Sequence, residues 1–183
     1  RSSDLTYNRF LIPEPRISFR FWLRKNSSFK TSFSHTSQFE NLLSNSISPF
    51  TSLEVWLPAS TNIKPQISDQ FVISFQQNFE NIHCSLTAEA FYKKMQNQID
   101  YIDHAKMLFN PFIEAELRFG TTRSQGIELM FSKTEGPLQG WLAYTLSSTF
   151  MDFPDLNQGR PYRASYDRPN DLSIVMQYQI KPR

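Results

Sequence analysis

Apolar and polar residues alternate strictly over several separate runs of this sequence, and that two-residue period constrains the fold more than any other feature. One such run covers residues 126–133, and another covers 138–147. A tight turn at 134–137 joins them, and a long polar and aromatic stretch, 148–171, follows. Strict alternation is typical of β-strands that are apolar on one face. The chain is therefore predicted to be an all-β protein.

The same unit of strand, turn and strand recurs along the chain. The alternating runs are 16–23, 29–34, 70–76, 82–93, 126–133, 138–147 and 173–180. Short turns begin near residues 24, 77, 133 and 181, and three irregular connections lie between them, at 36–69, 100–123 and 148–171. We therefore predict an antiparallel meander of about seven strands. A helix over 86–98 is an alternative, because Ala, Glu, Lys, Met and Gln favour helices, but the apolar spacing there fits a period of two better.

The turns and the connections differ greatly in length, which distinguishes the two ends of the predicted sheet. A soluble β-sandwich shows turn signals every 8–12 residues, whereas tight turns here alternate with long connections. Short periplasmic turns and long extracellular loops are typical of outer-membrane barrels. We therefore predict that the strands form part of a large transmembrane β-barrel. A soluble all-β binding module, with two apolar sheet faces packed together, is the alternative.

Charged residues in these runs fall on the face opposite the apolar residues. A charge on the lipid face of a barrel costs about 2–4 kcal/mol near the bilayer midplane, whereas a charge on a water-filled lumen costs little. Residues predicted to face the lumen are Arg16, Arg20, Lys30, Glu89, Lys93 and Glu128. Aromatic residues near strand ends are predicted to form the interfacial girdles: Trp22, Phe79, Tyr92 and Trp141.

The composition excludes several other classes of protein. The chain has 183 residues, which is enough for one domain with a core, and 15% of them are aromatic, which argues against disorder. The net charge is only +2 and no block of basic residues is present, so no nucleic-acid partner is predicted. Cys84 is the one cysteine, so no internal disulfide forms. No apolar stretch is long enough for a transmembrane helix.

No motif for catalysis, metal binding or cofactor binding stands out. His35, His83 and His104 lie far apart, and no cysteine or carboxylate stands at metal-ligand spacing from them. The acidic pairs in 100–103 and 152–155 are interpreted as solvated loop residues rather than as a Ca²⁺ site. A P-loop, a Gly-x-Ser-x-Gly motif and a dinucleotide fingerprint are all absent. We expect neither an enzyme nor a bound metal or cofactor.

Aromatic residues are frequent in the long connections, where Asn, Gln and Arg accompany them. Such residues suit ligand capture at a barrel mouth, and the alternative is that they pack loop against loop. The candidate ligand-binding residues are Trp56, Tyr101, Phe109, Phe112, Phe153 and Tyr162. Tyr166, Asp167 and Arg168 are instead predicted to order the base of the last loop.

An ordered set of short motifs resembles a known family over nearly the whole chain. The motifs are EPRIS at 14–18, LP at 57–58, NIKPQ at 62–66, FYKKM at 91–95, GIEL at 126–129, GWLAYTLS at 140–147, NQG at 157–159 and YDRPNDL at 166–172. Together they resemble the barrel of TonB-dependent outer-membrane receptors, especially those of the Bacteroidetes type. Pro169 and Asn170 occupy the variable middle of the last motif.

The resemblance implies a receptor that imports a nutrient ligand across the outer membrane. It implies a barrel of about 22 strands, a plug domain, and a segment that contacts TonB, with a surface lipoprotein as a further candidate partner. About seven strands cannot close such a barrel, so residues 1–183 are expected to be an internal barrel segment. The plug domain and the remaining strands are expected to lie outside it. A structural or adhesive outer-membrane barrel is an alternative to transport, and sugars, peptides, siderophores and cobalamin all remain open as ligands.

Overall fold

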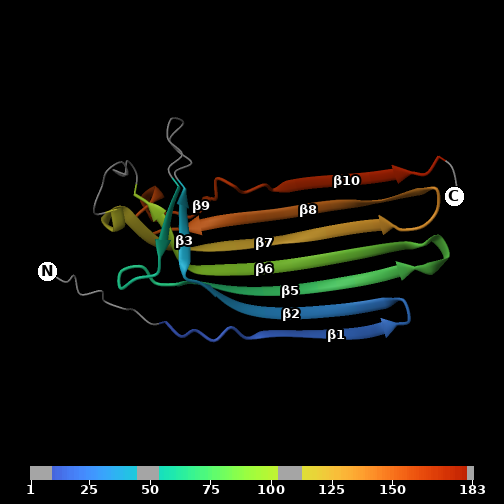
Figure 1. Cartoon of the computed structure of the whole chain (residues 1–183), viewed down its shortest axis with the longest axis horizontal. Helices are drawn as coiled ribbons and strands as arrows, with labels where there is room; N and C mark the ends of the chain where they lie inside the picture. The colour runs from blue at the N-terminus through green and yellow to red at the C-terminus, as the bar shows by residue number, and fades with distance from the viewer. Residues whose placement is uncertain (1–9, 45–53, 103–112, 181–183) are drawn as a thin grey trace.

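The computed structural model describes residues 10–44, 54–102 and 113–180 (Figure 1). Ten strands and three short 3-10 helices lie in these residues. The strands are β1 (Arg16–Arg24), β2 (Ser27–Gln38), β3 (Glu40–Ser44), β4 (Glu54–Pro58), β5 (Gln66–Phe79), β6 (Cys84–Tyr101), β7 (Leu117–Lys133), β8 (Leu138–Asp152), β9 (Tyr162–Arg163) and β10 (Asn170–Tyr178). The helices are η1 (Glu80–Ile82), η2 (Ile113–Glu116) and η3 (Asn157–Gly159).

Seven long strands form one antiparallel sheet in the order β1-β2-β5-β6-β7-β8-β10. Short β9 pairs with β8, and β3 pairs with β4 as a separate hairpin. The predictions of an all-β fold and of an antiparallel meander are confirmed, because these seven strands correspond to the seven alternating runs. The alternative helix over 86–98 is wrong, since those residues lie in β6.

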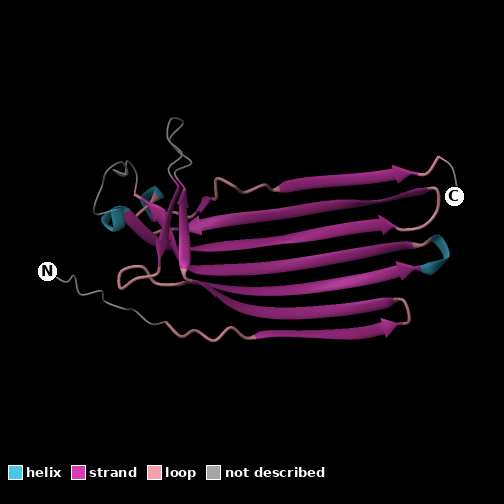
Figure 2. Ribbon diagram, viewed as in Figure 1, coloured by secondary structure: helices cyan, strands magenta, loops and turns pink. Residues whose placement is uncertain are grey.

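The two ends of the sheet differ as predicted (Figure 2). Tight turns join β1 to β2, β5 to β6 through η1, and β7 to β8. Gly136 takes a φ of +100° in the last of these turns, a conformation that other residues adopt only with strain. The short turns predicted near 24, 77 and 133 are confirmed, and the one near 181 lies outside the described residues.

The long connections contain more regular structure than the sequence indicates. The sequence predicts that residues 36–69 are irregular, but β2 continues to Gln38, β5 begins at Gln66, and the β3–β4 hairpin lies between them. Likewise β7 begins at Leu117 and β8 continues to Asp152. The prediction failed because these strand extensions carry polar residues on both faces. The alternation therefore ends before the hydrogen-bonded ladder does.

The strand register brings the apolar positions together on one side of the sheet, which we call the apolar face. One row across it contains Phe21, Phe29, Phe75, Ala88, Leu129, Tyr144 and Leu172. The next row contains Phe19, Thr31, Ile73, Ala90, Ile127 and Leu146. Because neighbouring side chains on a strand point to opposite faces, these rows form one continuous surface.

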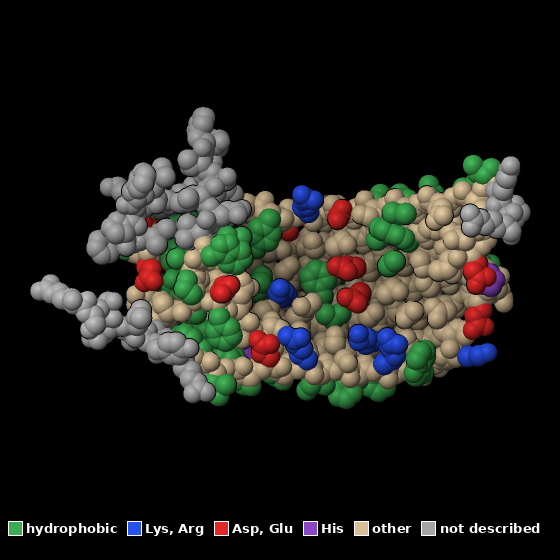
Figure 3. All heavy atoms as spheres, viewed as in Figure 1, with side chains coloured by type: hydrophobic (Ala, Val, Ile, Leu, Met, Phe, Trp, Pro, Cys, Tyr) green, Lys and Arg blue, Asp and Glu red, His purple; other side chains and the backbone are tan. Residues whose placement is uncertain are grey.

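The opposite side of the sheet, which we call the charged face, carries ionisable residues in two rows. One row contains Arg20, Lys30, Ser74, Glu89, Glu128, Thr145 and Asp171. Arg16 and Lys93 belong to a further row on this face, through Ser34 and Gln70. Figure 3 shows charged side chains spread across the sheet face seen in that view. All six residues predicted to face a lumen therefore share one face.

The predicted aromatic girdle is only half correct. Phe79 and Tyr92 belong to the apolar face, at its two ends along the strands. Trp22 and Trp141 are wrong as girdle residues, because their register partners Ser28 and Ser132 lie on the charged face. The Arg20 guanidinium lies 5.7 Å from the centre of the Trp22 ring, a cation–π contact on that face.

The apolar face has no covering layer among the described residues. Phe19 is 57% exposed, Ile127 is 51% exposed and Ile174 is 52% exposed. Apart from the β3–β4 hairpin, no second sheet is present in the part of the chain that the structure describes, so the stacked sheets of a soluble sandwich are not found there. No helix within the described ranges is long and apolar enough to cross a membrane.

Candidate functional site

Side chains from several segments pack together at the end of the sheet that carries the long loops. We call this region the loop-end cap, and it comprises β3, β4, residues 59–65, η2, and residues 153–169, which include η3 and β9 (Figure 1). Ile63, Ile99 and Leu117 form a buried hydrophobic cluster in the cap, and Leu57 and Tyr101 pack against it. The cluster joins the hairpin to the ends of β6 and β7. The cap therefore has a core of its own.

Polar contacts fix the cap to the strand ends. Asn62 Nδ2 donates to Glu114 Oε2 at 2.7 Å, which connects the segment before β5 with η2. Asn97 stands at the bulge in β6 with a φ of +56°, and its Nδ2 donates to the Pro65 carbonyl at 2.8 Å. Asparagine tolerates this left-handed conformation better than most residues. The bulge therefore bonds β6 to the residue that precedes β5.

A second buried group lies where β8 ends. Phe153 is 0% exposed, and a Cβ on Gly120 would lie 2.5 Å from its Cγ atom. Glycine at position 120 therefore makes the space that the Phe153 ring fills. The Tyr162 ring lies 6.4 Å from the Phe153 ring between centroids, and Tyr162 Oη donates to Asp100 Oδ2 at 3.4 Å. This group unites β6, β7 and β9.

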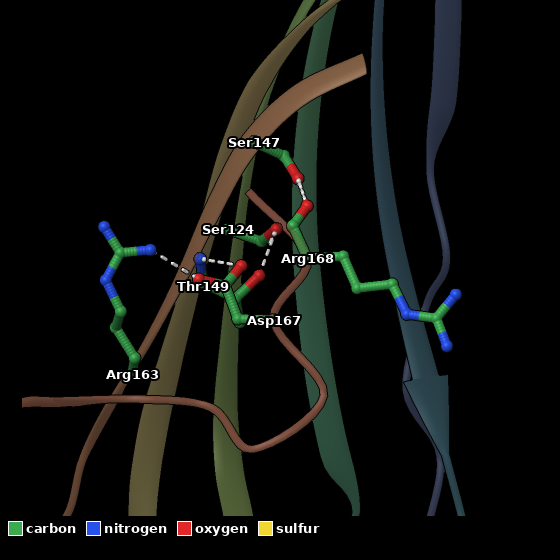
Figure 4. A network of polar contacts seen from close by, with 6 residues as sticks. All are labelled: Ser124, Ser147, Thr149, Arg163, Asp167 and Arg168. Atoms are coloured by element: carbon green, nitrogen blue, oxygen red, sulfur yellow. Dashed lines mark hydrogen bonds and ion pairs between the residues drawn. The ribbon is translucent and has the colours of Figure 1, made fainter. Parts of the chain in front are cut away.

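Asp167 orders the last loop before it enters β10 (Figure 4). Its carboxylate, on a side chain that is only 3% exposed, accepts the Thr149 backbone N–H at 3.0 Å and Arg163 Nη1 at 2.8 Å. The Arg168 carbonyl accepts Ser147 Oγ at 3.3 Å, and the Arg168 side chain points away from the network. The prediction that this stretch orders the loop base is confirmed for Asp167 and Arg168.

Glu14 connects the segment before β1 to β2. Its Oε1 atom accepts Ser37 Oγ at 2.7 Å and the Ser37 backbone N–H at 2.8 Å. These hydrogen bonds, together with the nearby Arg16 guanidinium, hold the pKa of the Glu14 carboxyl below its ordinary value. Glu14, the first residue of the EPRIS motif, therefore binds the neighbouring strand β2 as a carboxylate anion.

The structure separates the predicted ligand-binding residues into different environments. Trp56 lies on β4, is 62% exposed, and is paired in register with Leu42. Tyr101 is the last residue of β6 and packs on the hydrophobic cluster, so its expected position in a loop is wrong. Phe153 and Tyr162 lie together, but Phe153 is inaccessible in this arrangement. Phe109 and Phe112 lie outside the described residues, and ligand contact by any of the six stays a prediction.

Sequence reasoning missed the residues that build this end of the sheet. Gly120 and Asn97 matter through backbone shape, which alternation does not reveal. The sequence indicates Asp100 only as one of a pair of loop acids, whereas in the structure it accepts a hydrogen bond from Tyr162. Within the described ranges, no group of three or more His, Cys, Asp or Glu residues is placed to hold a metal ion.

The geometry resembles one wall of a barrel, with a polar lumen side, an apolar outer side and an elaborated loop end. A family model described as TonB dependent receptor-like, beta-barrel, matches residues 5–178. The chain belongs to this family. No curated protein and no solved structure is found to match the chain. The family consists of outer-membrane proteins, in which the barrel works with a plug domain and with TonB.

Proposed function

We propose that this chain is part of the wall of an outer-membrane TonB-dependent transporter of the Bacteroidetes type, which binds a nutrient at the loop-end cap and imports it. The observation that carries the proposal is the continuous apolar face, which stays exposed across seven strands. An apolar surface of this extent is not stable against water, since exposed patches on soluble monomers are a few hundred Å². Lipid is the solvent that suits it.

The height of the apolar face fits a bilayer. Asp69 and Phe79 bound this face on the same side of β5, ten residues apart, and Phe71, Ile73, Phe75 and Gln77 lie between them. At roughly 3.4 Å per residue this is about 34 Å along the strand. A strand tilt of about 40° reduces it to about 26 Å along the barrel axis. The apolar band of transmembrane barrels is about 25 Å tall.

The two ends then have different surroundings. The tight turns lie on the periplasmic side, and the loop-end cap lies outside the cell, because barrels of this kind keep short turns inside and long loops outside. The charged face lines the lumen, where a plug domain from elsewhere in the receptor contacts it. Energy for import reaches the receptor through TonB. A surface lipoprotein over the cap stays a prediction, and we propose no enzymatic activity.

Site-selective labelling tests the placement. Single cysteines replace Ser165 in the last loop and Lys25 in the β1–β2 turn of the full receptor, with Cys84→Ser as background; both positions are exposed. We expect an impermeant maleimide to label S165C in intact cells and K25C only after the outer membrane is permeabilised. Labelling of K25C in intact cells contradicts the orientation. Absence of the receptor from the outer-membrane fraction contradicts the placement.

Growth on defined nutrients tests transport. A strain that lacks the receptor, and a strain that lacks TonB, are compared with the parent on glycans, peptides, iron–siderophores and cobalamin as limiting nutrients. We expect both deletions to abolish growth on the same nutrient. Normal growth of both strains on every nutrient contradicts import and favours a structural or adhesive barrel.

A further inference from the structure

A charged row lies at the outer boundary of the apolar face. It contains His35, Asp69, Lys94, Arg123, Phe150 and Arg163. Lys94 lies two residues beyond Tyr92 on β6, and Arg123 lies four residues from Ile127 on β7, so both cations share the apolar face with these residues. We call this set the outer-edge row, and it lies on the apolar face next to the loop-end cap.

Lys94 and Arg123 are directly opposite each other in the register of β6 and β7. Like charges in this position destabilise a sheet. Neither side chain makes an ion pair or a side-chain hydrogen bond with another described residue, and Arg123 is exposed. Two adjacent cations that form no ion pair with a described residue make a site for an external anion.

The other charges of the row are already engaged. Asp69 is the register partner of Lys94, but its Oδ1 atom lies 2.6 Å from His35 Nδ1. Arg163 bonds to Asp167, and its guanidinium lies 5.3 Å from the centre of the Phe150 ring. Of the two cations, Asp69 therefore stands opposite Lys94 alone, and it is engaged by His35, which leaves the Lys94–Arg123 pair with an excess of positive charge.

The height of the row decides which anion fits. It lies at the upper limit of the band that is about 26 Å tall, one step beyond the row that contains Phe71 and Tyr92. At this level a lipid places its headgroup, while its acyl chains lie against the apolar residues below. Cations at this boundary cost little, and they attract anionic headgroups.

We propose that Lys94 and Arg123 bind the phosphate of an anionic outer-leaflet lipid, whose chains lie on the apolar face beneath them. The proposal rests on the proposed membrane placement. The two basic side chains reach one phosphate from adjacent strands, and the aromatic rings of Phe71 and Tyr92 contact the upper part of the chains. The site makes the barrel wall selective for phosphate-bearing lipid at this position.

The test uses the full receptor in neutral detergent and a matched pair of double variants. K94Q/R123Q removes the two cations of the proposed site. K30Q/K93Q removes the same charge from the charged face, and Lys93 is the neighbour of Lys94 in sequence. Diphosphoryl lipid A is the probe, its dephosphorylated form is the comparison lipid, and inorganic phosphate reports a free anion. Binding is followed by native mass spectrometry and by the shift in unfolding temperature.

We expect K94Q/R123Q to bind the phosphorylated lipid roughly 30-fold more weakly than the parent, because each basic residue at an anionic headgroup contributes roughly fivefold. K30Q/K93Q keeps the parent affinity, and the dephosphorylated lipid and inorganic phosphate give no shift. Equal binding by both double variants overturns the proposal, as does a full shift with inorganic phosphate alone. If the receptor is in the outer membrane and the two double variants bind the lipid equally, only this inference fails. If the receptor is absent from the outer membrane, the proposed function fails.

Discussion

The wall of the sheet and the loop-end cap bury their apolar side chains in different ways. In the wall, Phe19 and Ile127 remain more than half exposed. In the cap, Phe153 is 0% exposed and Ile63 is 1% exposed. The cap therefore has its own core, whereas the wall requires an apolar partner from outside the chain. The apolar residues of the wall are therefore suited to lipid, whereas those of the cap are buried as in a water-soluble protein. The boundary between the two regions lies at the outer-edge row.

The largest expected effect tests the core of the cap. Phe153→Ala leaves a cavity above Gly120, so it should lower the free energy of unfolding by about 3–5 kcal/mol. Phe131→Ala on the apolar face is the control, because lipid fills the space left there and the loss should be less than half as large. Urea unfolding in lipid vesicles gives both values. Equal losses would mean that wall and cap are packed alike.

A charge in the middle of the wall should have the next largest effect. Ile127→Arg places a cation near the bilayer midplane and should cost about 2–4 kcal/mol. Glu128→Arg, on the charged face and opposite Glu89, should change stability by no more than about 0.5 kcal/mol. The same vesicle unfolding experiment compares them. If the two substitutions cost the same, the sidedness of the sheet is wrong.

Loss of the Asp167 carboxylate should loosen the cap without affecting the wall. Asp167→Asn weakens the bonds to the Thr149 N–H and to Arg163, so we expect a local cost of about 1–3 kcal/mol. Hydrogen exchange should speed up at the Thr149 amide and stay unchanged at Ile127. The control is Asp171→Asn, whose side chain is exposed. An unchanged exchange rate at the Thr149 amide in the Asp167→Asn variant would contradict the role of Asp167 in ordering the loop.

The smallest effect is a pH dependence at the Glu14 contact. Its pKa is lowered in the folded state, so the folded chain holds the proton less tightly than the unfolded chain does. The contribution is therefore present above the ordinary carboxyl range and is lost as the pH falls through the lowered pKa. Hydrogen exchange at the Ser37 amide should rise on acidification, and Glu14→Gln should remove this dependence. A pH-dependent Ser37 amide in the Gln variant contradicts the assignment.

Much of the wall could be predicted from the sequence, because a two-residue period reports directly which side chains share a face. Ile127, Leu129 and Phe131 lie where their alternation placed them. Trp22 and Trp141 show the limit, since their hydrophobicity suggested the lipid side while their parity placed them on the charged face. For these two residues, the position in the hydrogen-bonded strand and not the hydrophobicity of the side chain determines which face of the sheet they occupy.

The cap could not be predicted in the same way, because its order comes from contacts between distant segments. Gly120 and Phe153 stand 33 positions apart, and nothing in either local pattern pairs them. The β3–β4 hairpin was missed because residues 36–69 show no period. Its position depends on Leu57 and Ile63 packing against β6 and β7. In such a region residue type alone does not indicate exposure, and one of the candidate ligand residues, Phe153, is buried.

The most direct measurement is a nitroxide scan of residues 124–132 along β7 in the full receptor, reconstituted in lipid vesicles. Collision rates with oxygen, which concentrates in lipid, and with a water-soluble nickel chelate are recorded at each position. We expect the collision rates to show a period of two, with the oxygen rate highest at Ile127, Leu129 and Phe131 and the nickel rate highest at Glu128 and Met130. The absence of alternation, or oxygen maxima at Glu128 and Met130, would contradict the assignment of the apolar face to lipid.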